Sequence, residues 1–201
     1  MLKSLCGFAN PGSAVYSLRN QVAGRSEKQF FNYRNANRNF MLGRYYSSLT
    51  HVNESGKASM VDITAKPITS RTAHAQGKVM LGRDAFYAVK DNQVKKGDVL
   101  TVAQIAGIQA AKQTSNLIPF CHQVNLSKVE LNFSLNEADH SVLVESKAVC
   151  DGKTGVEMEA IIAVSVAACT IYDMCKAINK GIEITDIFLI SKYGGKGPYE
   201  R

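Results

Sequence analysis

A long apolar segment in the C-terminal half, Lys153–Lys180, constrains the fold more than any other part of the chain. It reads KTGVEMEAIIAVSVAACTIYDMCKAINK, and its apolar residues recur at helical spacing. Thr154 and Glu157 have the spacing of a capping box, so we expect one long helix to begin there. Small side chains dominate its apolar positions, which lets another element approach closely. Those positions are Ala160, Ala163, Val164, Ala167, Ala168 and Ile171.

Ionisable side chains interrupt this apolar segment near both of its ends. Glu157 and Glu159 lie near the start, and Asp173 and Lys176 lie near the end. Burying a charge costs free energy unless the charge is paired, and an apolar helix has no structural need for these side chains. Their presence therefore indicates a function. On a continuous helix, Glu159 and Asp173 would be roughly 21 Å apart, because each residue adds about 1.5 Å. Either the acidic start lies outside the helix, or a site that uses both ends is shared between subunits.

The first 46 residues differ in composition from the rest of the chain. They hold seven Lys or Arg residues against one acid, Glu27, which is six charges of the formal net charge of +7. An Arg-rich, Ser-rich and acid-poor segment is typical of a mitochondrial transit peptide, and the alternative is a basic arm that contacts nucleic acid. We therefore expect a transit peptide at residues 1–46, with localisation in the mitochondrial matrix, and a flexible lead-in at residues 47–59.

The remaining chain, residues 60–201, suits a single domain with its own core. Without the N-terminal segment the formal net charge falls to +1, so the folded part gives no support for nucleic-acid binding. No secretory core or membrane span is evident from the sequence. The five cysteines form no CxxC pair and show no zinc spacing, so we expect free thiols and no metal site.

Element patterns predict an α+β fold with two main helices on one antiparallel sheet. A strand is expected at His74–Leu81, a short helix at Arg83–Lys90, and a helix from Val99 to about Thr114 that Asp98 caps. Alternation at residues 129–135 and 142–148 predicts a β-hairpin before the long helix, and residues 182–190 predict a final strand. This order favours a ferredoxin-like sandwich, with a mobile Gly- and Lys-rich tail from Ser191.

The residues alone indicate acid/base chemistry on an anionic substrate. Asp173 and Lys176 are either a plain helix-surface ion pair or a partly buried pair suited to proton transfer. His122, after an apolar loop, is a catalyst or an ordinary loop residue. Several basic residues fall beside turns or caps, and their convergence would suit a phosphate-bearing ligand. These are Lys66, Arg71, Lys96, Lys112, Lys176, Lys192 and Lys196.

Six motifs, in order along the chain, resemble those of the cyclic pyranopterin monophosphate synthase family (molybdenum cofactor biosynthesis protein C). The resemblance covers roughly residues 60–196, and several long motifs in order are more specific than any one of them. The motifs are MVDITAK at Met60–Lys66, KKGD at Lys95–Asp98, AGIQAAK at Ala106–Lys112, LIPFCH at Leu117–His122, KTGVEMEA at Lys153–Ala160 and IYDMCKA at Ile171–Ala177.

The resemblance implies a lyase that converts 3′,8-cyclo-7,8-dihydro-GTP to cyclic pyranopterin monophosphate and releases diphosphate. It also implies a homohexamer, a trimer of dimers with sites at the dimer interfaces. No cofactor is implied, although Mg²⁺ can accompany the triphosphate. The catalytic residues implied are Asp173, Lys176, His122 and Lys96. The substrate-binding residues implied are Phe120, Cys121, His122, Met158, Glu159, Glu157, Lys112 and Lys192.

The tail departs from the family pattern, because Pro198 follows Gly197 where many relatives have a Gly-Asp-Phe-like ending. This departure bears on any role of Lys196. Two other functions are compatible with the residues: a nucleotide hydrolase on the same scaffold that forms no pterin, and a basic mitochondrial binding protein without catalysis.

Overall fold

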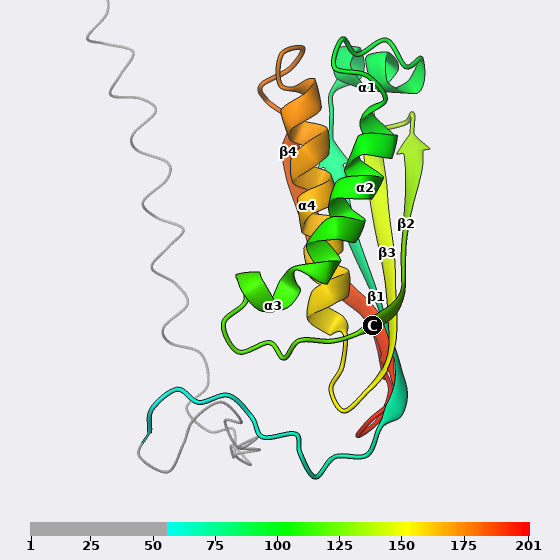
Figure 1. Cartoon of the computed structure of the whole chain (residues 1–201). Coiled ribbons are helices and arrows are strands. Elements are labelled where there is room, and N and C mark those ends of the chain that lie inside the picture. Colours follow the sequence, from blue (N-terminus) through cyan, green and yellow to red (C-terminus); the bar gives the residue numbers. More distant parts are fainter. Residues whose placement is uncertain (1–55) are drawn as a thin grey trace, which may run out of the picture. The chain divides into compact units, whose positions relative to one another are not determined.

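A five-stranded antiparallel sheet with helices on one face makes up the part of the chain that the computed structural model describes, residues 56–201 (Figure 1). The expected transit peptide at residues 1–46 and most of the expected lead-in lie outside the described residues. The elements are β1 Thr69–Met80, α1 Arg83–Lys90, α2 Val99–Lys112, α3 Thr114–Leu117, β2 Leu126–Asn136, β3 Ser141–Gly152, α4 Glu157–Cys175, β4 Glu183–Tyr193 and β5 Tyr199–Glu200. Their strand order, β2-β3-β1-β4-β5, confirms the predicted ferredoxin-like α+β sandwich.

Helix α4 is the core helix of this sandwich. The six periodic positions that the sequence singled out, from Ala160 to Ile171, are all fully buried. Their small side chains face the inward row of β1, where Ala73, Ala75 and Val79 are also fully buried. By length and composition α4 could cross a membrane, but half of its most apolar window is buried inside the protein, as in a core helix.

Helix α2 lies beside α4 on the same face of the sheet and runs in the opposite direction (Figure 1). Its start is capped as predicted, because the Asp98 side chain accepts a hydrogen bond from the Thr101 backbone N–H at 3.0 Å. The inward face of α2 consists of small residues, and two large apolar side chains of this helix face outward. Ala103 and Gly107 are buried, whereas Val102 and Ile105 are 41% and 63% exposed. Because α2 carries apolar residues on both sides, its sequence does not indicate which side faces the core.

The predicted capping box at the start of α4 is wrong. The N-cap residue is Val156, and no side chain caps the helix. Glu157 is the first helical residue, and its carboxylate pairs with the ammonium of Lys192 at 2.8 Å instead of closing on Thr154. Lys192 on β4 therefore pairs with the Glu157 carboxylate, which the sequence spacing had assigned to a helix cap.

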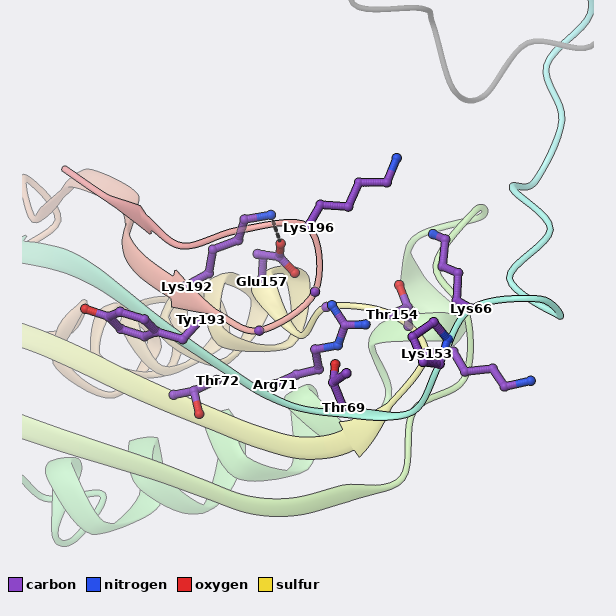
Figure 2. A pocket seen from close by; sticks show the side chains of 14 residues that line it. Lys66, Thr69, Arg71, Thr72, Lys153, Thr154, Glu157, Lys192, Tyr193 and Lys196 are labelled. Carbon is purple, nitrogen blue, oxygen red and sulfur yellow. Dashed lines mark ion pairs between the residues drawn. The ribbon is translucent and has the colours of Figure 1, made fainter.

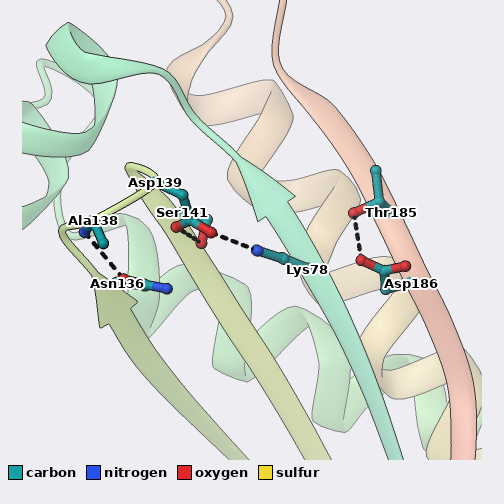
Figure 3. Close-up of polar contacts among 7 residues, drawn as sticks. All are labelled: Lys78, Asn136, Ala138, Asp139, Ser141, Thr185 and Asp186. Carbon is teal, nitrogen blue, oxygen red and sulfur yellow. Dashed lines mark hydrogen bonds and ion pairs between the residues drawn. The ribbon is translucent and has the colours of Figure 1, made fainter.

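The two ends of the sheet are closed by different contacts. At the β2–β3 turn, the Asp139 carboxylate accepts hydrogen bonds from Lys78 and Ser141, both at 2.6 Å (Figure 3). At the other end, the tail that we expected to be mobile folds back, and β5 pairs with Ser191 and Lys192 of β4. This return brings the tail glycines against β1.

Gly107 sets how closely α2 approaches α4, and its replacement provides a test of this packing. A Cβ at this position would lie 2.8 Å from the Ala163 backbone oxygen and 2.6 Å from a Leu131 methyl carbon. We expect Gly107→Ala to lower the free energy of unfolding by roughly 1–2 kcal/mol, because overpacking outweighs the gain in helix propensity. Urea unfolding measures this change. The exposed Gln109→Ala in the same helix should change it by less than about 0.5 kcal/mol, and equal values for the two variants would contradict the prediction.

Candidate active site

All the site residues expected from the sequence except Lys112 form two groups at opposite ends of α4. Because α4 is continuous from Glu157 to Cys175, Glu159 and Asp173 belong to one helix. The possibility that the acidic start lies outside the helix is therefore wrong. Their separation is roughly 21 Å along the helix axis, at about 1.5 Å per residue. One subunit cannot bring both carboxylates to one small substrate.

The group at the C-terminal end of α4 is an ion triad of Lys96, Asp173 and Lys176. The ammonium groups of Lys96 and Lys176 lie 2.8 Å and 2.7 Å from the two Asp173 carboxylate oxygens. Lys96 also donates a hydrogen bond to the Asp173 backbone oxygen at 2.8 Å. The sequence could pair Asp173 with Lys176 from their spacing, whereas Lys96 comes from the loop before α2, and only the fold places it there.

The triad is open to solvent in one subunit, since 55% of the Asp173 side chain is exposed. The sequence left open whether Asp173 and Lys176 form a surface ion pair or a partly buried one. In a single subunit they form a surface ion pair. Hydrogen bonds from Lys176 and Lys96 lower the pKa of Asp173 to about 2, and the same contact raises the pKa of Lys176. Asp173 is consequently ionised at neutral pH and fixes two ammonium groups side by side.

The group at the N-terminal end of α4 lines two adjoining cavities. The first has a volume of about 380 Å³, and we call it the basic cleft (Figure 2). Its charged lining residues are Lys66, Arg71, Lys153, Glu157, Lys192 and Lys196. Five cations against one carboxylate suit a polyanionic ligand. Of the basic residues expected to converge, Lys66, Arg71, Lys192 and Lys196 meet here. Lys96 and Lys176 lie at the other end of α4, and Lys112 lines neither this cleft nor its neighbour.

Glycines of the tail form part of the wall of the basic cleft. Gly194 and Gly195 have φ values of 93° and 73°, which few other residues adopt. A Cβ on Gly194 would lie 2.2 Å from the Ser70 backbone oxygen, and one on Gly195 would collide with the Arg71 guanidinium. The tail backbone thus rests directly on Arg71. Lys196 follows at once and lines the cleft, although Pro198 departs from the family's ending.

A second cavity of about 450 Å³ adjoins the basic cleft, and we call it the Glu159 pocket. The two cavities share Lys66, Thr154, Gly155, Glu157 and Lys196 in their walls. The remaining wall of the Glu159 pocket includes five residues that the resemblance assigned to substrate binding. These are Phe120, Cys121, His122, Met158 and Glu159.

Glu159 is the buried acid of this pocket. It is 4% exposed, and within residues 56–201 no Lys, Arg or His lies within ion-pair distance of it. Burial raises its pKa from an ordinary 4.5 to about 6, so the carboxyl can both take up and release a proton near neutral pH. Burial and the Glu159 charge also raise the pKa of the Cys121 thiol, which keeps that thiol protonated.

Sequence reasoning assigned no role in the site to Lys153 or Thr69, which also line the basic cleft. Lys153 lines it and donates a hydrogen bond to the Thr64 backbone oxygen at 2.7 Å, which ties the segment before β1 to the start of α4. Thr69 lines it from the first position of β1. Lys153 opens the KTGVEMEA motif, which was a signal for it, whereas nothing in the sequence marked Thr69. No group of three potential metal ligands occurs within the described residues.

Comparison with known proteins gives a consistent set of relatives. The MoaC family model matches residues 60–195. A Heliobacterium modesticaldum protein named cyclic pyranopterin monophosphate synthase is 55% identical over 154 residues, which cover 76% of this chain and 97% of that protein. An Arabidopsis thaliana protein named as the mitochondrial form is 57% identical over 150 residues, covering 75% of this chain and 56% of that protein.

An animal relative is longer than this chain. Molybdenum cofactor biosynthesis protein 1 of Drosophila melanogaster is 53% identical over 161 residues, which cover 80% of this chain and 28% of that protein. The chain therefore spans little more than a quarter of the fly protein and nearly all of the bacterial relative.

The raised pKa of Glu159 predicts how stability depends on pH. Because the folded state binds this proton more tightly than the unfolded state, stability falls as pH rises from about 4.5 to about 6. Glu159→Gln removes this titration while keeping the shape of the side chain. The variant should be more stable than the wild type by roughly 2 kcal/mol at pH 7.5 and of similar stability at pH 4. Urea unfolding across this pH range measures the difference. A constant difference between pH 4 and pH 7.5 would count against the prediction.

Proposed function

This chain belongs to the MoaC family, and on that premise we propose that it is a cyclic pyranopterin monophosphate synthase of molybdenum cofactor biosynthesis. The observation that carries the proposal is the basic cleft next to the buried acid Glu159. Its substrate is 3′,8-cyclo-7,8-dihydro-GTP, and its products are cyclic pyranopterin monophosphate and diphosphate. The enzyme is therefore a phosphorus–oxygen lyase.

The basic cleft binds the triphosphate in this proposal. Lysine ammonium groups act as point charges on phosphate oxygens, and Arg71 offers a planar fork of donors. The ribose-derived oxygen attacks the innermost phosphorus, and the bond to the bridging oxygen breaks, so diphosphate leaves with the bonding electron pair. Cations around that position stabilise the developing negative charge. Any Mg²⁺ would arrive with the triphosphate and belong to the substrate.

The guanine-derived part occupies the Glu159 pocket. Its ring is opened by water and closed again as a pterin, which requires protons to be taken up and released at several atoms. Glu159, with a pKa of about 6, and His122 in the same pocket are placed for these transfers. Asp173 and Lys176 form the second proton-transfer pair, in which the ionised Asp173 fixes the Lys96 and Lys176 ammonium groups.

A shared site reconciles these roles with the length of α4. If two subunits pair about a two-fold axis near the middle of antiparallel α4 helices, Asp173 of one subunit comes beside the Glu159 pocket of the other. The exposed Val102 and Ile105 on the outward side of α2 are suited to contact with a second copy. Three such dimers form the proposed homohexamer. Residues 1–46 direct the chain to the mitochondrial matrix in this proposal.

Turnover by the full chain tests the reaction. With the cyclised dihydro-GTP substrate, we expect the wild type to form the pterin product and one diphosphate per turnover. Asp173→Asn and Lys176→Ala should lower kcat by roughly 10²- to 10⁴-fold, because each removes part of the proton-transfer pair. Asp186→Asn is the matched control, since this exposed residue with a φ of 54° lies on β4 and Asn tolerates that conformation. Phosphate release without pterin would favour a nucleotide hydrolase, and binding without turnover would favour a binding protein.

Mixed subunits test whether the site is shared. Glu159→Gln and Asp173→Asn are each expected to be inactive alone. When the two variants are unfolded together and reassembled, half of the random dimers are mixed, and one of the two sites in each is intact. Activity should recover to about a quarter of the wild-type value. Failure to recover any activity, with mixed assembly verified by mass, would place both carboxylates in separate functions within one subunit.

A further inference from the structure

The inward face of β1 changes from apolar to polar near the N-terminal end of α4. Side chains alternate along a strand, so Thr69 and Arg71 point to the same face as the fully buried Ala73 and Ala75. Ala73 and Ala75 are covered by the body of α4. Thr69 and Arg71 lie beyond the first turn of α4, where the sheet face forms the floor of the basic cleft. On its inward face, the strand therefore carries polar side chains only at the cavity.

Thr69 has a buried hydroxyl group without a partner. Within residues 56–201, its Oγ1 is the one buried side-chain oxygen or nitrogen that makes no hydrogen bond. A buried polar group that lacks a partner costs free energy, and almost all such groups in folded proteins are paired. Other buried hydroxyls of this chain follow that rule: Ser146 donates to the Ala160 backbone oxygen at 2.7 Å, and Thr114 donates to the Ala111 backbone oxygen at 3.0 Å.

No side chain lies directly opposite Thr69 on the neighbouring strand β3. Its cross-strand neighbour is Gly152, which has no side chain. The Gly152 backbone oxygen is already engaged by the Arg71 Nε at 3.3 Å. Figure 2 shows Thr69 on β1 beneath Arg71, among the other residues that line the basic cleft. Thr69 therefore lines the cleft, and its unpaired hydroxyl oxygen lies within that wall, shielded from water.

We propose that Thr69 is a substrate-binding residue whose hydroxyl donates a hydrogen bond to a phosphate oxygen in the basic cleft; this inference rests on the proposed function. Phosphate oxygens accept hydrogen bonds, and the surrounding cations bring them to the cleft. The lysines attract the polyphosphate from many directions because they are flexible point charges. The Thr69 hydroxyl lies on a rigid strand, so its hydrogen bond has a fixed direction. This fixed direction selects one orientation of the polyphosphate.

The role predicts that Thr69→Val weakens binding of the substrate and of pyrophosphate without lowering the stability of the ligand-free protein. Valine keeps the shape of threonine and replaces the hydroxyl with a methyl group. We expect KM for the cyclised dihydro-GTP substrate, and Kd for inorganic pyrophosphate by calorimetry, to rise about 10- to 100-fold, the loss for a hydrogen bond to a charged group. The thermal midpoint of the ligand-free variant should not fall, because no protein hydrogen bond is lost. A purely structural hydroxyl would give the reverse: a lower midpoint and unchanged affinity.

Two further variants of the full chain complete the test. Thr69→Ser keeps the hydroxyl and should stay within about threefold of the wild-type Kd for pyrophosphate. Thr185→Val removes a threonine hydroxyl on β4 that bonds Asp186 at 3.1 Å, away from the cleft, and should leave pyrophosphate binding unchanged (Figure 3).

The results separate this inference from the proposed function. Wild-type pterin formation together with an unaltered KM and Kd in Thr69→Val would overturn the role of Thr69 and leave the reaction standing. An absence of pterin formation by the wild type would overturn the proposed reaction. The Kd of Thr69→Val for pyrophosphate would then decide by itself whether Thr69 binds anions.

Discussion

The close contact between α4 and the rest of the sandwich determines where chemistry can take place in this protein. Alanines on its inward face, together with Gly77 and Gly107 opposite, let the helix lie against the sheet and against α2 without large intervening side chains. The helix contains no proline or glycine, the residues at which kinks commonly occur. The helix is continuous over 19 residues, and it keeps its two charged ends apart. The core helix thus divides the candidate site residues into two groups.

The two ends of α4 have opposite electrostatic environments. At its start, Glu159 is buried, and loss of hydration makes its carboxyl group hold a proton more tightly. At its end, Asp173 lies in solvent between two ammonium groups and gives up its proton readily. Two carboxylates on one helix thus differ in pKa by about four units, from about 6 to about 2. Such a difference allows one carboxyl group to exchange protons while the other remains a fixed charge.

Most of the fold could be predicted from the sequence, because it depends on patterns within each segment. The periodicity of α4, the Asp98 cap of α2 and the alternation of the hairpin each rest on neighbouring residues. The failures concern contacts between distant segments. The capping box failed because Lys192, 35 positions along the chain, binds Glu157. The inward side of α2 was not evident because that helix is apolar on both sides.

The candidate site also combines residues that local sequence patterns could predict with residues that depend on contacts between distant segments. Motif resemblance named the residues of the Glu159 pocket and the triad, and local spacing joined Asp173 to Lys176. Neither could show that Lys153 ties down the segment before β1, since that contact spans 89 positions. Thr69 escaped notice because a threonine at the start of a strand is ordinary in sequence, and its special feature is a missing partner.

Exposure of the Lys96–Asp173–Lys176 triad makes its geometry sensitive to ionic strength. Dissolved ions screen charges that water can reach, over a distance of about 8 Å in physiological salt. In a single subunit, added salt therefore weakens the electrostatic attraction between the Asp173 carboxylate and the two ammonium groups. A surface that covers the triad and excludes water strengthens every one of these attractions, at the cost of removing three charges from solvent. Assembly would thus turn a salt-sensitive cluster into one whose geometry is largely independent of the surrounding electrolyte.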